Sequence, residues 1–276
     1  LEYNRNFEFV LDTVLDCDAV AELVSRCEII FHLAAAVGVK YVIDNPLASL
    51  RINTKGTENV FEAANRHKCK VVLASTSEIY GKNEKESLSE NDDRILGPTA
   101  ISRWGYSCTK AFDEFLALAY WREKKLPVVT LRFFNTCGPR QTGDYGMVVP
   151  RFVKAALLGH PLQVFGDGKQ VRCFSYIGDI VDGTIALAEH PAAEGEVFNL
   201  GSTEAVTIEE LAQKIIMMTE SSSVIKYIPY DQAYEKGFED LRRRVPDISK
   251  AMRLVGFQPK ISLDELLSRV IEYFRK

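Results

Sequence analysis

The residues in this chain whose types and spacing best suit chemistry are Tyr106 and Lys110, which lie four positions apart. On a helix, side chains at this spacing share one face, with about 5–6 Å between their Cβ atoms. The apolar residues within 111–119 recur with helical spacing and predict such a helix. A phenol has a pKa of about 10 and is a poor base at neutral pH, but an ammonium group one turn away stabilises the phenolate. Alone, a Tyr-x-x-x-Lys pair is more often ordinary helix surface.

A second motif precedes this pair. Residues 70–74, with the apolar run 71–74 after a lysine, are typical of a buried parallel strand, and the sequence Ser75-Thr76-Ser77-Glu78 follows at once. In an open α/β sheet, ligands bind beyond the carboxyl ends of the strands. The hydroxyl groups at this strand end can therefore hold a sugar hydroxyl for the tyrosine base.

Together, the two motifs resemble the extended short-chain dehydrogenase/reductase family, which includes nucleotide-sugar epimerases, dehydratases and decarboxylases. The resemblance extends over the chain from about residue 7 onward. It implies an α/β fold, a Rossmann-like doubly wound parallel sheet with a smaller mixed α/β substrate domain. We expect residues 1–141 to bind NAD and residues 142–276 to bind the nucleotide sugar, with a crossover of the chain back into the first domain.

The start of the chain departs from the family pattern. Residues 7–12 and 28–33 are predicted strands with a helix over 18–27 between them, and they correspond to the third and fourth strands of a Rossmann sheet. A G-x-x-G-x-x-G turn should precede them and hold the cofactor pyrophosphate at a helix N-terminus, and the sequence contains no such turn. We expect that this N-terminal glycine-rich βα unit is missing from the front, the alternative being a lost cofactor site.

The resemblance also implies residues that bind NAD. Asp12 would lie near the adenine, and the small residues after the second predicted strand would let the cofactor approach the backbone. Asn53 matches an asparagine that orients the active-site backbone near the nicotinamide ribose. The implied NAD-binding residues are Asp12, Thr13, Leu33, Ala34, Ala35, Asn53, Ser75, Tyr106 and Lys110.

Catalysis and substrate binding are assigned in the same way. The implied catalytic residues are Thr76, Glu78, Tyr106 and Lys110, and the implied substrate-binding residues are Ser77, Asn135, Arg172 and Arg244. In the family, the tyrosine removes the proton of the sugar 4-hydroxyl, the threonine hydrogen-bonds the same oxygen, and hydride passes from C4 to NAD. Asn135 and Arg172 would contact the diphosphate, for which a guanidinium group is well suited.

The residues beside Thr76 bear on the particular reaction. A 4,6-dehydratase needs an Asp-Glu pair after the threonine, whereas this chain has Ser77-Glu78. UDP-glucuronate decarboxylases resemble it best, because they carry Thr-Ser-Glu and an arginine at the position of Arg244, near the substrate carboxylate. Phe238 stands where aminoarabinose-pathway decarboxylases have tyrosine, so a UDP-glucose or UDP-glucuronate 4-epimerase is the alternative. A non-catalytic dinucleotide-binding protein is less favoured, because such proteins tend to lack the tyrosine or the lysine.

Composition excludes several other classes. The 276 residues are 46% hydrophobic and 26% charged, with a net charge of −4, which predicts a globular protein with neither a nucleic-acid nor a membrane partner. Six scattered cysteines without a CxxC pair and four dispersed histidines predict no metal site and a reducing, cytoplasmic location. The family resemblance implies a homodimer, paired through helices over 47–66 and 102–124.

Local signals in the second half predict a few more elements. The sequence Gly166-Asp167-Gly168 between two apolar runs predicts a β-hairpin. Thr207 with Glu210, and Ser262 with Glu265, have the spacing of capping boxes that open helices.

Overall fold

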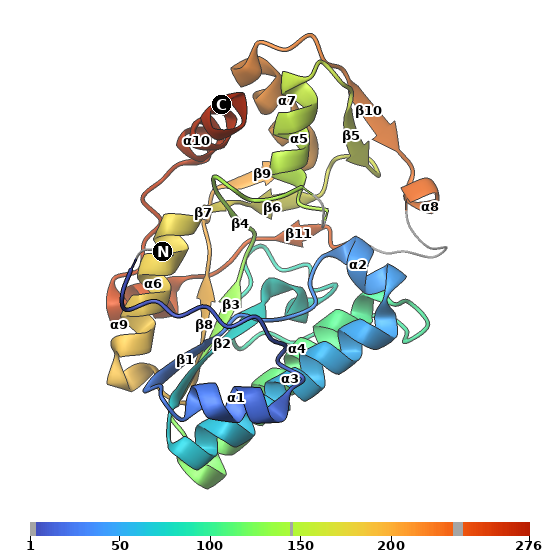
Figure 1. Cartoon of the computed structure of the whole chain (residues 1–276). Coiled ribbons are helices and arrows are strands. Elements are labelled where there is room, and N and C mark those ends of the chain that lie inside the picture. Colours follow the sequence, from blue (N-terminus) through green and yellow to red (C-terminus); the bar gives the residue numbers. More distant parts are fainter. Residues whose placement is uncertain (1–3, 144–145, 234–239) are drawn as a thin grey trace.

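The computed structural model describes residues 4–143, 146–233 and 240–276, and it shows a parallel sheet covered by helices on both faces (Figure 1). Short strands and helices, mainly from the second half of the chain, stand over the carboxyl edge of this sheet. The expected α/β fold with a parallel sheet is therefore confirmed.

The main sheet has four parallel strands in the order β1-β2-β3-β8. Its strands are β1 (Ile29–His32), β2 (Lys70–Thr76), β3 (Val128–Phe133) and β8 (Glu196–Leu200). The helices around it are α1 (Cys17–Val24), α2 (Val39–Asp44), α3 (Pro46–His67), α4 (Arg103–Lys124), α6 (Ile177–Glu189) and α9 (Ser249–Val255), with short 3₁₀ helices η1 (Ser77–Tyr80) and η2 (Pro191–Ala193). Because β8 follows residue 141 and pairs with β3, the chain crosses back to the main sheet. The domain division at residue 141 stays a prediction.

The sheet forms because its central strands are apolar on both faces, as buried parallel strands are. Val71, Val72 and Leu73 of β2 are fully buried. Helices α1, α3 and α4 pack on one face, where Phe61 enters the core, and α6 and α9 pack on the other, where Leu187 does. This packing fixes the carboxyl ends of β2 and β3 relative to α4.

The second part contains the remaining elements. They are β4 (Thr136–Cys137), β5 (Leu162–Phe165), β6 (Val171–Cys173), β7 (Ser175–Tyr176), β9 (Ala205–Thr207), β10 (Ile225–Ile228), β11 (Arg243–Arg244), α5 (Val148–Leu157), α7 (Ile208–Thr219), α8 (Tyr230–Ala233) and α10 (Leu263–Arg275). Helices α5, α7 and α10 enclose a core of their own with β5 and β9. The capping box of Thr207 and Glu210 is confirmed at the start of α7. At α10, Ser262 caps the backbone N–H of Glu265, whose carboxylate pairs with Arg269 instead of returning to the cap.

Two predicted elements are wrong. Residues 7–12 are not a strand, because no neighbouring strand pairs with them among the described residues, and Phe9 and Leu11 are 74% and 87% exposed. The segment around Gly166 and Gly168 is not a hairpin, since β5 pairs in parallel with β10 while β6 pairs with β9 and β11. Both glycines have φ of 73°, and the turn they form sends the chain from one small sheet to another.

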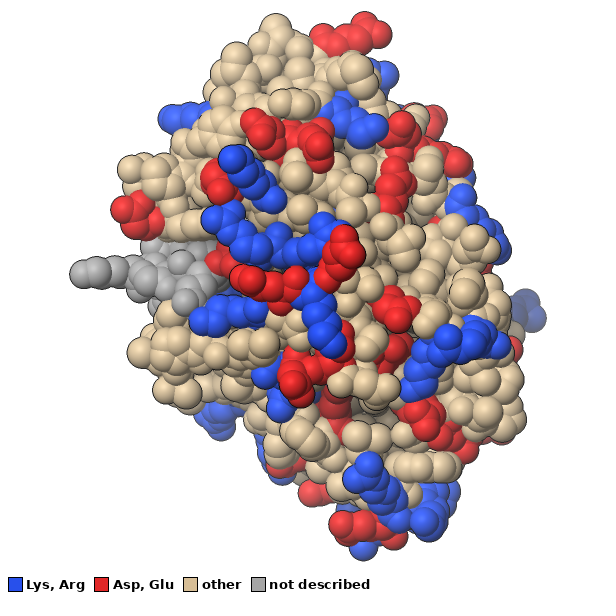
Figure 2. All heavy atoms as spheres, turned by 180° about the vertical axis from the view of Figure 1, so that it is seen from behind, with Lys and Arg blue, Asp and Glu red and all other residues tan. Residues whose placement is uncertain are grey.

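The surface carries charges of both signs. On the face shown in Figure 2, lysine and arginine side chains are interspersed with aspartate and glutamate. Across the described residues, we find no helix with enough length and apolar character to span a bilayer.

Candidate active site

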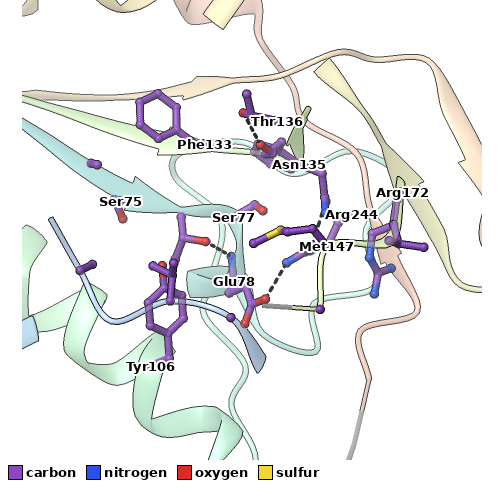
Figure 3. A pocket seen from close by; sticks show the side chains of 18 of the residues that line it. Ser75, Ser77, Glu78, Tyr106, Phe133, Asn135, Thr136, Met147, Arg172 and Arg244 are labelled. Atoms are coloured by element: carbon purple, nitrogen blue, oxygen red, sulfur yellow. Dashed lines mark hydrogen bonds and ion pairs between the residues drawn. The ribbon is translucent and has the colours of Figure 1, made fainter. Parts of the chain in front are cut away.

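A cleft of about 800 Å³ lies where the carboxyl ends of β2 and β3 meet the second part of the chain (Figure 3). Its walls include Thr76 and Asn135 from these strand ends, Tyr106 from α4, and Arg172 and Arg244 from β6 and β11. Since ligands of parallel α/β sheets bind at this edge, we regard the cleft as the candidate active site.

Most of the residues expected from the sequence come together here. Those that line the cleft are Leu33, Ala35, Ser75, Thr76, Ser77, Glu78, Tyr106, Lys110, Asn135, Arg172 and Arg244. Those that do not are Asp12, Thr13, Ala34 and Asn53. Phe238 lies outside the described residues. The individual roles of these side chains stay predictions.

The turn after β2 is held by its own side chains. The Thr76 Oγ1 atom accepts a hydrogen bond from the backbone N–H of Glu78 at 3.2 Å and caps η1. The Ser107 hydroxyl donates to the carbonyl of Glu78 at 2.9 Å. This second bond ties η1 to α4, so the threonine and the tyrosine helix have a fixed relative position.

Helix α4 presents Tyr106 and Lys110 on the same side, as their spacing predicts. The Lys110 ammonium is buried, donates to the carbonyl of Ala74 at 3.0 Å and pairs with Asp113 at 3.0 Å. The carbonyl belongs to β2, so this lysine also fixes the helix against the strand.

The acidity of Tyr106 differs from the expectation. Burial raises the pKa of its phenol above the ordinary value, and the negative charges of Glu78 and Asp113 act in the same direction. A hydrogen bond with Thr76 and the charge of Arg244 act against them. In the chain by itself Lys110 does not lower this pKa, and its ammonium is paired with Asp113. The expected stabilisation of the phenolate, which also relied on the charge of a cofactor ring, stays a prediction.

Asn53 does not line the cleft but connects segments that do. It is 1% exposed, its Oδ1 accepts from the backbone N–H of Ala36 at 2.7 Å, and its Nδ2 donates to the Ala36 carbonyl at 3.3 Å and the Thr109 hydroxyl at 3.4 Å. These contacts join the segment after β1 to α4. They fit the expected role of this asparagine in orienting the backbone.

Arg244 joins the two parts of the chain inside the cleft. Its Nη1 donates to the Glu78 carboxylate at 3.2 Å, and its Nη2 donates to the Asn135 Oδ1 at 2.9 Å (Figure 3). The side chain is buried, and its Nε has no hydrogen-bond partner among the residues that the structure describes. An unfilled donor on a buried cation is well suited to an anionic ligand.

A charge cluster surrounds this contact, and we define it as Glu78, Arg103, Arg172, Asp240 and Arg244. The Asp240 Oδ1 accepts from Arg103 at 2.8 Å and from Arg172 at 3.1 Å. Burial by itself raises the pKa of Glu78, but Arg103 and Arg244 outweigh it and hold the pKa below its usual range. Burial lowers the pKa of Arg172 to about 10. With three cations and two anions the charge cluster is net positive.

Sequence reasoning missed Arg103 and Asp240. Arg103 stands three residues before Tyr106, a spacing that shares a helix face and was available as a signal. Asp240 adjoins the arginine run 242–244, but only the tertiary structure shows that it pairs with Arg103, 137 residues away in the sequence.

The end of the cleft beside Lys110 fits the nicotinamide ribose that the family resemblance implies. Ala35 and Ala74, which have small side chains, are among the lining residues, and the carbonyl of Ala74 accepts from Lys110. The Lys110 ammonium has three N–H groups and uses two in the bonds to Ala74 and Asp113, which leaves one for a ligand hydroxyl. Over the described residues, no group of three or more potential ligands could hold a metal ion.

A comparison against protein families agrees with the fold. The family model described as GDP-mannose 4,6-dehydratase matches residues 1–270, and the chain belongs to this family. The expected membership in the extended short-chain dehydrogenase/reductase group is thereby confirmed.

Individual relatives point in the same direction. The chain is 41% identical over 276 residues to UDP-N-acetyl-alpha-D-glucosaminuronate decarboxylase of Bacillus cytotoxicus, covering 100% of this chain and 85% of that protein. It is 35% identical to UDP-glucuronic acid decarboxylase 1 of Danio rerio, covering 99% of this chain but only 62% of that protein. Among solved structures, UDP-glucuronic acid 4-epimerase of Bacillus cereus, in complex with UDP-glucuronic acid and NAD, matches with a TM-score of 0.88 and 30% identity, covering 99% of this chain and 83% of that one.

Proposed function

We propose that this protein is an NAD-dependent decarboxylase of a UDP-linked uronic acid, with UDP-glucuronate as the first substrate to test. The observation that carries the proposal is the position of Arg244, a buried cation that lines the same cleft as Thr76 and Tyr106 and whose Nε has no partner among the described residues. The 4-hydroxyl and the C5 carboxylate of a hexuronate lie on adjacent carbons. A site that oxidises C4 therefore needs its carboxylate-binding cation close to its base.

The first step removes the proton of the sugar 4-hydroxyl. Tyr106 would take the proton of the 4-hydroxyl, while Thr76 would hydrogen-bond the same oxygen. NAD, when bound, would supply the chemistry that oxidises C4 to a ketone and later reverses this. Lys110 would hold the ribose through its remaining N–H group. Relatives with NAD in their described complexes support this choice of cofactor.

The second step removes the carboxylate. With a ketone at C4, the C5 carboxylate belongs to a β-keto acid, so the C5–C6 bond breaks, its electron pair forms an enolate with the C4 oxygen, and carbon dioxide leaves. A proton must then reach C5. The depressed pKa of Glu78 keeps this carboxylate ionised at neutral pH, so it is better suited to orient a water molecule than to act as the acid.

The decisive experiment incubates the full-length protein and NAD with UDP-glucuronate or UDP-N-acetylglucosaminuronate and follows carbon dioxide and nucleotide products. We expect carbon dioxide with UDP-xylose or the 4-keto pentose from the first substrate, and the corresponding N-acetylated pentose from the second. The Tyr106→Phe variant is the control and should release none.

The second candidate is a 4-epimerase, favoured by the structural similarity to the Bacillus cereus epimerase. A carboxylate held by Arg244 serves that reaction as well, so the contacts alone do not separate the two. UDP-galacturonate without carbon dioxide, or activity restricted to UDP-glucose, would refute the decarboxylase and leave the epimerase.

We further propose that the protein is a cytoplasmic homodimer that pairs through α3 and α4. Leu47 and Phe115 on these helices are 69% and 64% exposed, and the six cysteines are all free, which fits a reducing compartment. Sedimentation of the Phe115→Glu variant should show a shift to monomer. Met217→Glu, at a 70% exposed site on α7, is the matched control and should leave the dimer intact.

A further inference from the structure

A buried acid that the proposed mechanism does not use lies next to its lysine. Asp113 is fully buried, and its Oδ2 lies 3.0 Å from the Lys110 Nζ. Tyr106, Lys110 and Asp113 occupy positions i, i+4 and i+7 of α4, so the three side chains follow one face of the helix. Asp113 Oδ1 has no hydrogen-bond partner among the described residues. A buried carboxylate is costly unless it is paired and hydrogen-bonded, and here Lys110 provides the pairing.

The other charged and titratable groups around Asp113 do not compensate it. On the same helix, Glu114 is bound to Arg132 at 2.7 Å. From β1, His32 faces Lys110, but burial lowers the pKa of this histidine to about 4, so it is neutral at pH 7. From α3, the Thr57 hydroxyl donates to the Asn53 carbonyl at 2.7 Å. Burial raises the pKa of Asp113 to about 6, while the charge of Lys110 and the side chains of Lys110 and Thr57 act against burial, so the carboxyl is ionised at pH 7. Within the described residues, Lys110 is the cation that pairs with Asp113.

We propose that Asp113 is a positioning residue that sets the acidity of Tyr106, because it anchors the Lys110 ammonium and offsets its charge. Lys110 then has two fixed contacts, with Asp113 and with the carbonyl of Ala74, and it lines the cleft. The negative charge of Asp113 also acts on the phenol of Tyr106. The inference rests on the proposed role of Tyr106 as the base.

The geometry gives the size of the effect. Tyr106 and Asp113 are seven residues apart, which is about 10 Å along a helix that rises ~1.5 Å per residue. With an effective dielectric constant of about 20, removal of one negative charge at that distance lowers a phenol pKa by about one unit. Glu78 and Arg244, which also act on Tyr106, are unchanged by this removal.

The test is a titration of the Asp113→Asn variant of the full-length protein with NAD. The ultraviolet absorbance of the phenolate is recorded against pH, and the same protein with Tyr106→Phe is subtracted to isolate this one phenol. We expect the Tyr106 pKa to fall by about one unit, and the acidic limb of kcat/KM to move to lower pH by the same amount. Glu123→Gln, an exposed acid at the far end of α4, is the matched control and should shift neither.

An unchanged Tyr106 pKa in folded Asp113→Asn would overturn the inference and leave Asp113 a structural residue only. If that variant does not fold, Asp113→Ser is titrated in its place with the same expected shift. The phenolate titration needs no nucleotide sugar, so it gives a result even if no UDP-uronate is turned over. Decarboxylation with an unchanged pKa would refute this inference and leave the proposed function intact.

Discussion

Replacement of Arg244 by lysine keeps the positive charge but removes the planar fork of N–H groups. In the structure this fork donates to Glu78 at 3.2 Å and Asn135 at 2.9 Å, and its buried Nε has no partner among the described residues. A lysine ammonium is a compact point charge on a flexible stem and does not reproduce three fixed donor directions. The substrate carboxylate should lose the contact that the proposed function assigns to it.

The magnitude follows from the number of bonds lost. A hydrogen bond to a charged group contributes about 1.5–3 kcal/mol, and each ~1.4 kcal/mol corresponds to a factor of ten. Loss of one such bond to the transition state should reduce kcat/KM for UDP-glucuronate by about 10- to 100-fold. UDP-glucose has no carboxylate, so its oxidation at C4 should change much less.

The assay measures kcat/KM for both nucleotide sugars in the wild type, in Arg244→Lys and in a matched control. Arg242→Lys is that control, because Arg242 lies two positions away, is exposed and pairs with Asp167 on the surface. It should behave as the wild type. An equal loss on UDP-glucuronate and UDP-glucose would show that Arg244 binds the diphosphate shared by both, and the reasoning about the carboxylate would be refuted.

Three further predictions concern the base, the acid beside it and a buried histidine. Tyr106→Phe should lower kcat about 10²–10⁴-fold with NAD affinity retained, since general bases contribute that much; retention of a tenth of the activity would exclude Tyr106 as the base. Glu78→Gln should slow the protonation of C5, and so the formation of the pentose product, about 10²-fold, while C4 oxidation, followed by cofactor absorbance, and the first release of carbon dioxide continue; an equal loss of C4 oxidation would assign Glu78 to the first step. For His32, burial lowers the folded-state pKa to about 4 from 6.5, so the unfolded chain binds a proton more readily between these values. The free energy of unfolding should therefore fall by about 3 kcal/mol as the pH drops through this window. Urea titrations at pH 7 and pH 4 should show a smaller fall in His32→Gln, and identical falls would contradict the assignment.

The sequence alone determined the features that depend on local order. The apolar run of β2 followed directly by Thr76 predicted a strand that ends in hydroxyl groups, and the i, i+4 spacing of Tyr106 and Lys110 predicted a shared helix face. Both predictions required only the periods of strand and helix, which neighbouring residues fix. The Thr207 cap of α7 was local in the same sense.

The tertiary structure was needed for every feature that depends on contacts between segments distant in the sequence. The prediction of a hairpin around Gly166 was wrong because β5 and β6 do not pair with each other. Strand β5 pairs with β10 and strand β6 pairs with β9, both further along the chain. Arg103 meets Asp240 across 137 residues, and no local pattern encodes such a pair. The sequence likewise could not predict the pKa of Tyr106, which depends on burial and on the neighbouring charges of Glu78 and Asp113. A pKa depends on the dielectric surroundings and on every charge nearby, and only the folded chain brings these together.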